Sequence, residues 1–276
     1  ILQGQADIVL AGGVESMSNA PYIMETARWG QRLRHAQAFD LVWKSMQEYP
    51  VGGGMGLAAE RLVDKYNLTR KAQDELAMNS HLRAVRAIKE ERFKREIVPV
   101  EIPLRKGKTM VVDTDEHPRE DTTMESLGRL GAAFKEGGSV TAGNASGIND
   151  GAAAVIIMSD EKAAELGITP LATIREYSTV AVDPHLVGIA PVPAIRKVLD
   201  KSGLTIADIE LFEINEAFAA YYLPTEIELG LNRDITNVNG SGISLGHPVG
   251  CTGCRILVTL LYEMERQGLN LGISSL

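Results

Sequence analysis

The sequence predicts an α/β protein, because short apolar runs typical of strands alternate with segments of helical periodicity. The predicted strands come at 6–11, 97–102, 152–158, 171–182 and 209–214, and the predicted helices at 56–65, 69–92, 193–202 and 255–264. Three turns rich in small residues, around Ser146, Asn215 and His247, lie beside predicted strands. Strand ends are where α/β folds gather functional side chains, so we expect a site built from these turns.

The composition limits the classes of function. The chain has 276 residues, 45% hydrophobic and 23% charged, which is enough for one large or two modest domains. A net charge of −8 argues against wholesale binding of nucleic acid, and no apolar run is long enough to span a membrane. With only Cys251 and Cys254, a disulfide framework is excluded and a reducing compartment fits. We expect a cytoplasmic protein, with an organellar address left open because the chain begins at Ile1.

The first strand is predicted to end at Gly12-Gly13. The segment Ala27–Met46 mixes basic and aromatic residues, which favours a packed surface excursion that contacts another subunit. The glycines at 52–56 precede a helix through Lys65. They lack the Lys-Ser/Thr of a P-loop, so a turn is favoured over a phosphate site.

Thr69 is the predicted N-cap of the long helix. The stretch His81–Lys108 holds nine Lys or Arg, a pattern typical of a solvated face; its functional alternative is attraction of a phosphorylated small molecule. The acidic segment Asp113–Glu125 is predicted to be a loop that contains Arg119.

His247 lies in a glycine-rich turn before an apolar helix predicted from Arg255 onward. A histidine on a rigid turn suits acid–base chemistry, and the alternative is a core histidine bonded to a carbonyl oxygen. Asn215 has an alternative role as the cap of a helix that begins beside it.

Four motifs together resemble the thiolase family, of the acetyl-CoA acetyltransferase or 3-ketoacyl-CoA thiolase kind. They are AGGVESMSNAPY (11–22), GNASGINDGAA (143–153), EINEAFA (213–219) and NVNGSGISLGHPVG (237–250). The resemblance implies a layered αβαβα fold of two similar halves with an inserted loop domain, incomplete here at both ends. Residues 1–19 and 147–167 would belong to the N-terminal half, 20–146 to the loop domain and 168–276 to the C-terminal half, lacking its last strand.

The resemblance implies a reversible Claisen condensation of two acetyl-CoA to acetoacetyl-CoA and CoA. One alternative is a 3-ketoacyl-CoA thiolase of fatty-acid β-oxidation. Another, of a different class, is a non-catalytic CoA-binding or assembly protein. In the family the counterpart of His247 activates the nucleophilic cysteine and faces a thioester oxygen, and the counterpart of Asn215 holds a water in the oxyanion hole.

The same resemblance implies that coenzyme A binds as a substrate across the loop domain, with no metal and no further cofactor. Its contacts would be Ser146, Ala145, Gly147, Ala217, Phe218, Met55 and Arg119. For Phe218 and Met55 plain core packing is the alternative, and for Arg119 it is a solvated side chain. The family also implies a homodimer or homotetramer.

The chain departs from the family because both catalytic cysteines are absent. By register one would precede Ile1 and the other would follow Leu276, so we expect a segment that is inactive by itself. Cys251 and Cys254 are expected to be small packing residues rather than nucleophiles or zinc ligands. Gly54 replaces a histidine common in biosynthetic thiolases, which leaves the acyl chain length and the direction of the reaction open.

Overall fold

The computed structural model describes residues 1–48 and 53–276, so Gly52 of the predicted glycine run lies outside the described part. The strands are β1 (Ile8–Ser16), β2 (Tyr22–Ile23), β3 (Phe39–Asp40), β4 (Val100–Pro103), β5 (Thr109–Val112), β6 (Asp150–Met158), β7 (Leu211–Ile214) and β8 (Gly272–Ser275). The helices are α1 (Leu41–Gln47), α2 (Met55–Tyr66), α3 (Arg70–Lys89), α4 (Met124–Gly128), α5 (Asp160–Glu165), α6 (Pro191–Ser202), α7 (Ala219–Leu229), α8 (Gly242–Leu245) and α9 (Val249–Gln267).

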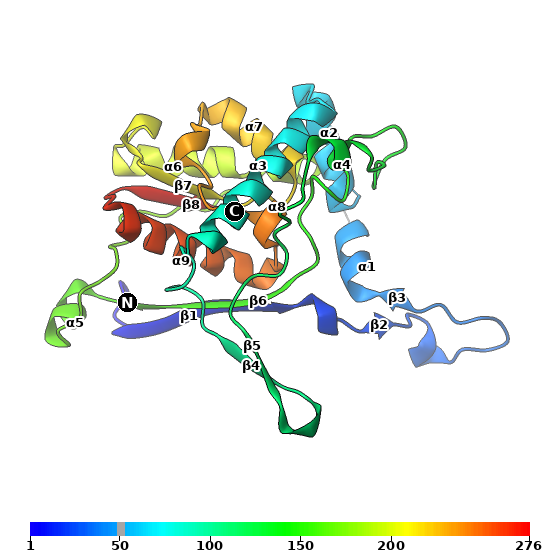
Figure 1. Ribbon diagram of the computed structural model, residues 1–276, viewed down its shortest axis with the longest axis horizontal. Helices are drawn as coiled ribbons and strands as arrows, with labels where there is room; N and C mark the ends of the chain where they lie inside the picture. Colours follow the sequence, from blue (N-terminus) through cyan, green and yellow to red (C-terminus); the bar gives the residue numbers. More distant parts are fainter. Residues whose placement is uncertain (49–52) are drawn as a thin grey trace.

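The elements form layers around α9 (Figure 1). On one side α9 packs against the antiparallel ribbon β1–β6, and on the other against the parallel pair β7–β8, whose far face is covered by α6. The predicted layered α/β class is confirmed. The helix begins at Val249, six residues earlier than the apolar pattern predicted.

The ribbon β1–β6 corrects the predicted end of the first strand. Gly12-Gly13 lies in the middle of β1, where Gly12 pairs with Ala154 and Gly13 with Ala153. A Cβ on Gly12 would lie 2.5 Å from the carbonyl oxygen of Ala153. These glycines therefore permit a close approach of backbones rather than ending the strand.

The main core lies where α3, α6 and α7 meet β7. Its largest fully buried side chains include Phe212, Ile214 and Ile195. All four residues of β7 are buried, as expected for a central parallel strand covered on both faces. This burial holds the carboxyl end of β7, and with it Asn215, in one position.

The long helix α3 begins as predicted. The Thr69 hydroxyl accepts a hydrogen bond from the backbone N–H of Ala72 at 3.1 Å, so the N-cap is confirmed. The basic stretch that follows is not simply a solvated face. Arg83 donates to the carbonyl oxygens of Thr236 and Arg233 at 2.7 and 2.8 Å, and so ties α3 to the loop before α8.

The predicted strand 171–182 is wrong. No described segment pairs with it; instead side chains of α6 hold it, with Lys197 Nζ donating to Thr179 O at 3.1 Å and Lys201 Nζ to Tyr177 O at 3.0 Å. A strand needs a partner backbone, which sequence periodicity cannot supply.

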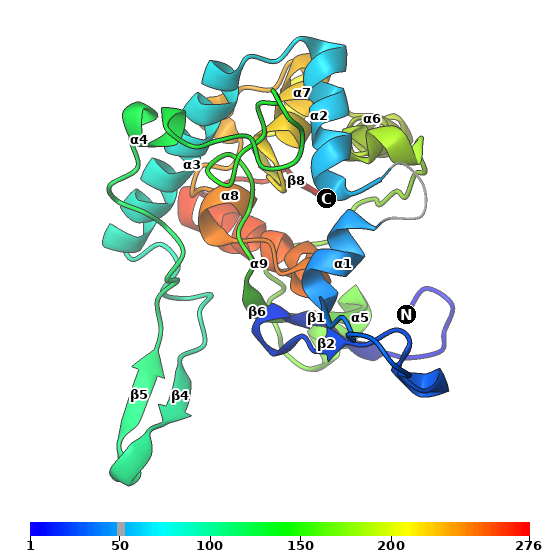
Figure 2. The same ribbon diagram turned by 90° about the vertical axis from the view of Figure 1, so that its right-hand side faces the viewer.

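Two segments project from the layered body (Figure 2). One is the hairpin β4–β5, of which only the first strand was predicted. The other is the part of 27–46 before α1 (Figure 1), which is not packed as predicted, because Trp29 is 86% and Leu33 98% exposed.

Candidate active site

Three glycines bring the His247 turn against the ribbon. A Cβ on Gly250 would lie 2.5 Å from Val14 O, and a Cβ on Gly151 would lie 2.7 Å from Pro248 Cγ. On the opposite side of this contact, a Cβ on Gly13 would overlap Gly250 O. Three of the sequence motifs therefore meet here, and each supplies a glycine because a side chain would push the turn away from the ribbon.

The backbone of His247 is held by Asn149. The His247 N–H donates to Asn149 Oδ1 at 3.3 Å, and Gly246, at φ 93°, packs directly on the Asn149 side chain. Asn149 comes from the loop that enters β6, so the turn is fixed from a second element. Sequence reasoning missed Asn149, although it lies inside one of the four motifs.

The His247 ring is half-buried and bonds to a hydroxyl, not to a carbonyl oxygen as the alternative predicted. Its Nδ1 lies 2.8 Å from Thr252 Oγ1. Burial, together with the charge of Arg255, lowers the pKa of His247 to about 4. The ring is therefore neutral near pH 7 and has a lone pair available to accept a proton.

Asn215 follows β7, and its role as a helix cap is wrong. Helix α7 begins at Ala219 with Phe218 at the N-cap position. Asn215 Oδ1 is buried and has no hydrogen-bond partner within 1–48 and 53–276. It lies against Gly242, where a Cβ would come within 2.6 Å of that oxygen. A buried acceptor without a partner is the state expected of a group that binds a water or ligand.

Glu216, which follows Asn215 in the chain, has a hydrogen-bond donor for each of its two carboxylate oxygens. Buried Glu216 accepts from the Ser80 hydroxyl at 2.6 Å and from Asn237 Nδ2 at 2.9 Å. Burial raises the pKa of Glu216, while these two hydrogen bonds act in the opposite direction. Glu216 therefore joins α3 to the start of the glycine-rich segment, a role that the motif alone did not reveal.

The small-residue segment around Ser146 pairs with the segment after Asn215. The Ser146 N–H donates to Ala217 O at 2.9 Å, and Ala145 forms an antiparallel bridge with Phe218. Four residues predicted to contact CoA are thus adjacent in space. About seventy residues of chain separate the pair Ala145 and Ser146 from the pair Ala217 and Phe218.

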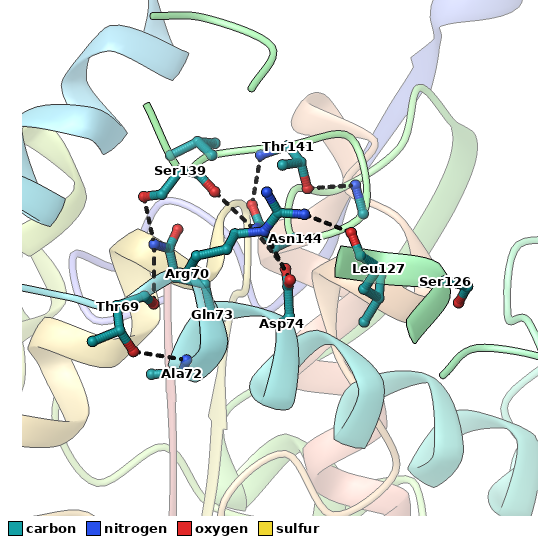
Figure 3. Close-up of polar contacts among 12 residues, drawn as sticks. Thr69, Arg70, Ala72, Gln73, Asp74, Ser126, Leu127, Ser139, Thr141 and Asn144 are labelled. Carbon is teal, nitrogen blue, oxygen red and sulfur yellow. Dashed lines mark hydrogen bonds and ion pairs between the residues drawn. The ribbon is translucent and has the colours of Figure 1, made fainter. Parts of the chain in front are cut away.

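A buried polar network supports this pairing (Figure 3). Asp74 accepts from Arg70 Nε at 2.7 Å and from Asn144 Nδ2 at 2.9 Å. Asn144 Oδ1 accepts from the Thr141 N–H at 2.8 Å, and its carbonyl oxygen accepts from the Ala219 N–H at 2.9 Å. Asn144 thus fixes the backbone just before Ala145 and Ser146 to both α3 and α7.

Phe218 and Met55 meet through Tyr221. The Phe218 ring packs edge-on against Tyr221 and Phe134, with centroids 4.9 and 5.8 Å apart, and the Tyr221 hydroxyl donates to Met55 O at 2.9 Å. Both predicted residues are only half-buried. The packing brings them together and leaves part of each surface accessible.

Arg119 lies at a cavity of about 450 Å³. Its lining is formed by Glu116, His117, Arg119, Asp121, Ile148 and Asn149. Arg119 is exposed, as the alternative of a solvated side chain predicted. Its backbone N–H donates a hydrogen bond to His81 Nδ1 at 3.1 Å. Gly147, another predicted CoA contact, packs against the ring of His117. Sequence reasoning missed His117, although it is only two residues from Arg119 in the chain. The shared Asn149 connects this cavity to the His247 turn.

The two cysteines lack the features of a nucleophile. Cys251 is 1% exposed, and burial raises the pKa of both the Cys251 and Cys254 thiols. Raised pKa values keep both thiols protonated and unreactive near pH 7. Within the described residues no cluster of His, Cys, Asp and Glu could hold a metal ion, and none of the helices there is both long and apolar enough to cross a membrane.

Comparison with known proteins places these features in one family. Residues 1–161 match the model of the thiolase N-terminal domain, and residues 168–276 match that of the thiolase C-terminal domain. An acetyl-CoA acetyltransferase of Syntrophomonas wolfei is 50% identical over 281 aligned residues, which cover 100% of this chain and 70% of that protein.

Solved structures agree with the sequence comparison. The crystal structure of the Bacillus anthracis acetyl-CoA acetyltransferase superimposes with a TM-score of 0.95 at 52% identity, covering 99% of this chain and 69% of that one. The human mitochondrial 3-ketoacyl-CoA thiolase gives a TM-score of 0.94 at 41% identity, covering 99% and 68%.

Proposed function

The chain belongs to the thiolase family, and on that premise we propose that it is the acetyl-CoA C-acetyltransferase type of thiolase, joining two acetyl-CoA into acetoacetyl-CoA and CoA. The reverse reaction is thiolysis of acetoacetyl-CoA. The observation that carries the proposal is the pair formed by a neutral, half-buried His247 and a buried, unpaired Asn215 Oδ1, which are separated by the single turn of α8.

His247 acts on the sulfur of the cysteine that carries the acyl group. A neutral imidazole removes the proton from the thiol, because only the thiolate attacks a thioester carbonyl. The C–S bond of acetyl-cysteine forms as the bond to the sulfur of CoA breaks. Cys251 and Cys254 do not take this role, because both thiols are held protonated.

Asn215 supports the oxyanion. Its unpaired Oδ1 accepts a hydrogen bond from a water, whose other hydrogen points at the oxygen on which negative charge develops. The orphaned acceptor supports this role, because a buried amide oxygen without any partner is costly to keep.

Coenzyme A binds along the segments that the fold pairs. We assign the pantetheine arm to the Ser146–Ala217 contact, with Phe218 and Met55 beside it. The exposed Arg119 at the cavity provides positive charge for a phosphate of CoA.

The alternative of a 3-ketoacyl-CoA thiolase is kept because one solved relative carries that name. The two functions differ in the acyl chain length of the 3-ketoacyl-CoA that the enzyme cleaves.

We propose that the protein is a homo-oligomer and that Ala27–Met46 forms part of the contact. Trp29, Leu33 and Trp43 are exposed by 86%, 98% and 61%, and this segment projects from the body. Exposed aromatic and apolar side chains on a projecting segment are typical of subunit contacts.

The function is tested with the product of the full open reading frame. The experiment compares its rates of thiolysis of acetoacetyl-CoA and of longer 3-ketoacyl-CoA. We expect cleavage that is fastest with acetoacetyl-CoA, and a loss of about 10²–10⁴-fold in kcat for His247→Ala. The matched control is His185→Ala, since His185 is exposed and, within the part of the chain that the structure describes, its side chain bonds only to Asp183 in its own turn.

Faster cleavage of longer chains would favour the 3-ketoacyl-CoA thiolase. CoA binding without any thiolysis would favour the non-catalytic binding protein and refute the proposed enzyme.

A further inference from the structure

Thr252 lies on the first turns of α9, five residues after His247, and is fully buried. Its hydroxyl has two polar neighbours. One is His247 Nδ1 at 2.8 Å, and the other is the carbonyl oxygen of Pro248 at 2.9 Å.

These two contacts determine the direction of the hydrogen bonds. A hydroxyl carries one hydrogen, and a carbonyl oxygen can only accept. If Thr252 donates to Pro248 O, its oxygen is left to accept from a hydrogen on His247 Nδ1. That arrangement satisfies both contacts, whereas donation to Nδ1 would leave the short contact with Pro248 O without a hydrogen.

We propose that Thr252 is a positioning residue that holds neutral His247 in the tautomer with hydrogen on Nδ1, so that Nε2 presents its lone pair to the substrate side. The inference rests on the proposed function for its catalytic meaning, because it identifies which ring atom accepts the proton of the thiol.

The neighbouring contacts make Thr252 suitable for this role. Pro248 O also accepts the backbone N–H groups of Cys251 and Thr252 at 2.8 and 2.9 Å, so it stays paired without the hydroxyl. A Thr252→Val substitution, which keeps the shape of the side chain, therefore removes the bond to the ring and leaves Pro248 O with its two backbone donors. The backbone of His247 keeps its bond to Asn149 in this variant.

The experiment compares Thr252→Val with Thr252→Ser in the product of the full open reading frame. Ring ¹⁵N resonances of labelled histidine report which nitrogen carries hydrogen, and the His247→Gln variant identifies the signal. We expect the wild type and Thr252→Ser to show hydrogen on Nδ1, and Thr252→Val to show a mixture of tautomers. Thiolysis kcat should fall about tenfold in Thr252→Val, the equivalent of one hydrogen bond, and recover in Thr252→Ser.

Two results would overturn the inference. One is a wild-type ring with hydrogen on Nε2. The other is a Thr252→Val variant whose ring spectrum and thiolysis both match the wild type. If the wild-type ring carries hydrogen on Nδ1 and loses it in Thr252→Val while no variant cleaves 3-ketoacyl-CoA, the positioning stands and the proposed function fails.

Discussion

Asn215 and Glu216 are adjacent in the chain, yet their hydrogen bonding is opposite. Both carboxylate oxygens of Glu216 are paired, with Ser80 and with Asn237, whereas Asn215 Oδ1 has no partner among the described residues. Paired buried groups hold a fold together, and an unpaired one raises the energy of the unliganded site. The motif thus combines a carboxylate with both oxygens paired and an amide oxygen for which we propose a role in the reaction.

Asn215→Ala is expected to lower kcat for thiolysis by about 10²–10³-fold, the usual effect of removing an oxyanion-hole group. Its unfolding temperature should stay close to that of the wild type, because Oδ1 makes no bond that the substitution breaks. Steady-state kinetics and thermal unfolding measure the two effects.

Asn237→Ala is the matched control. Asn237 exchanges hydrogen bonds of 2.8 Å with the backbone N–H and C=O of Ile214, so its loss should destabilise the fold by about 1–3 kcal/mol. Strong destabilisation by Asn215→Ala with little effect on kcat would reverse the two roles and contradict the assignment.

At the scale of elements, the N-terminal end of α9 decides the geometry of the site. The helix starts at Val249, two residues after His247, and touches β1 through Gly13 and Gly250. Glu15 on β1 accepts from the Gly250 N–H at 3.2 Å, which places a carboxylate at the positive end of the helix. The ribbon and α9 are therefore one unit at the site.

Gly250→Ala and Gly253→Ala are expected to have opposite effects, although both change a glycine of α9. A Cβ at Gly250 would press on Val14 O at 2.5 Å, so we expect a loss of about 1–3 kcal/mol in stability and reduced thiolysis. At Gly253 the nearest atom is Leu276 Cδ2 at 3.6 Å, an ordinary contact, and alanine should stabilise the helix by up to about 1 kcal/mol.

Chemical denaturation of both variants measures the difference. Equal stability of the two variants would mean that the contact between β1 and α9 is not tight in solution.

At the scale of the whole molecule, two segments project from the layers, the hairpin β4–β5 and the part of Ala27–Met46 before α1. In Ala27–Met46 the side chains of Trp29, Leu33 and Trp43 are exposed, and Lys44 pairs with Glu25, just outside the segment, at 3.0 Å. This combination of internal ion pairing and exposed aromatic rings favours a contact between copies of the protein.

Sedimentation of the full open reading frame product tests this contact. We expect an oligomer in the wild type and a smaller species when Trp29→Ser and Leu33→Ser are combined. Val98→Ser is the control, because Val98 is 81% exposed but lies outside the segment. The same mass for the wild type and the double variant would exclude the segment from the assembly.

The sequence by itself determined the features that depend on local chemistry. Alternating apolar runs predicted the layered α/β class, and Thr69 predicted the start of α3. These predictions hold because propensity, capping and backbone freedom act over a few residues. The motifs also pointed to Asn215, which follows β7, and to His247, which lies in the turn between α8 and α9.

The tertiary structure decided what depends on partners distant in the chain. The segment 171–182 has strand-like periodicity but no strand beside it, and Gly12-Gly13 lies inside β1 because Ala153 and Ala154 come close. Asn215 does not cap α7, because the N-cap position falls at Phe218, three residues further along the chain. The roles of Asn149 and His117 likewise arise from contacts between separate elements. Hydrogen bonds and close packing between such elements are set by the folded arrangement as a whole, so a single sequence read locally does not reveal them.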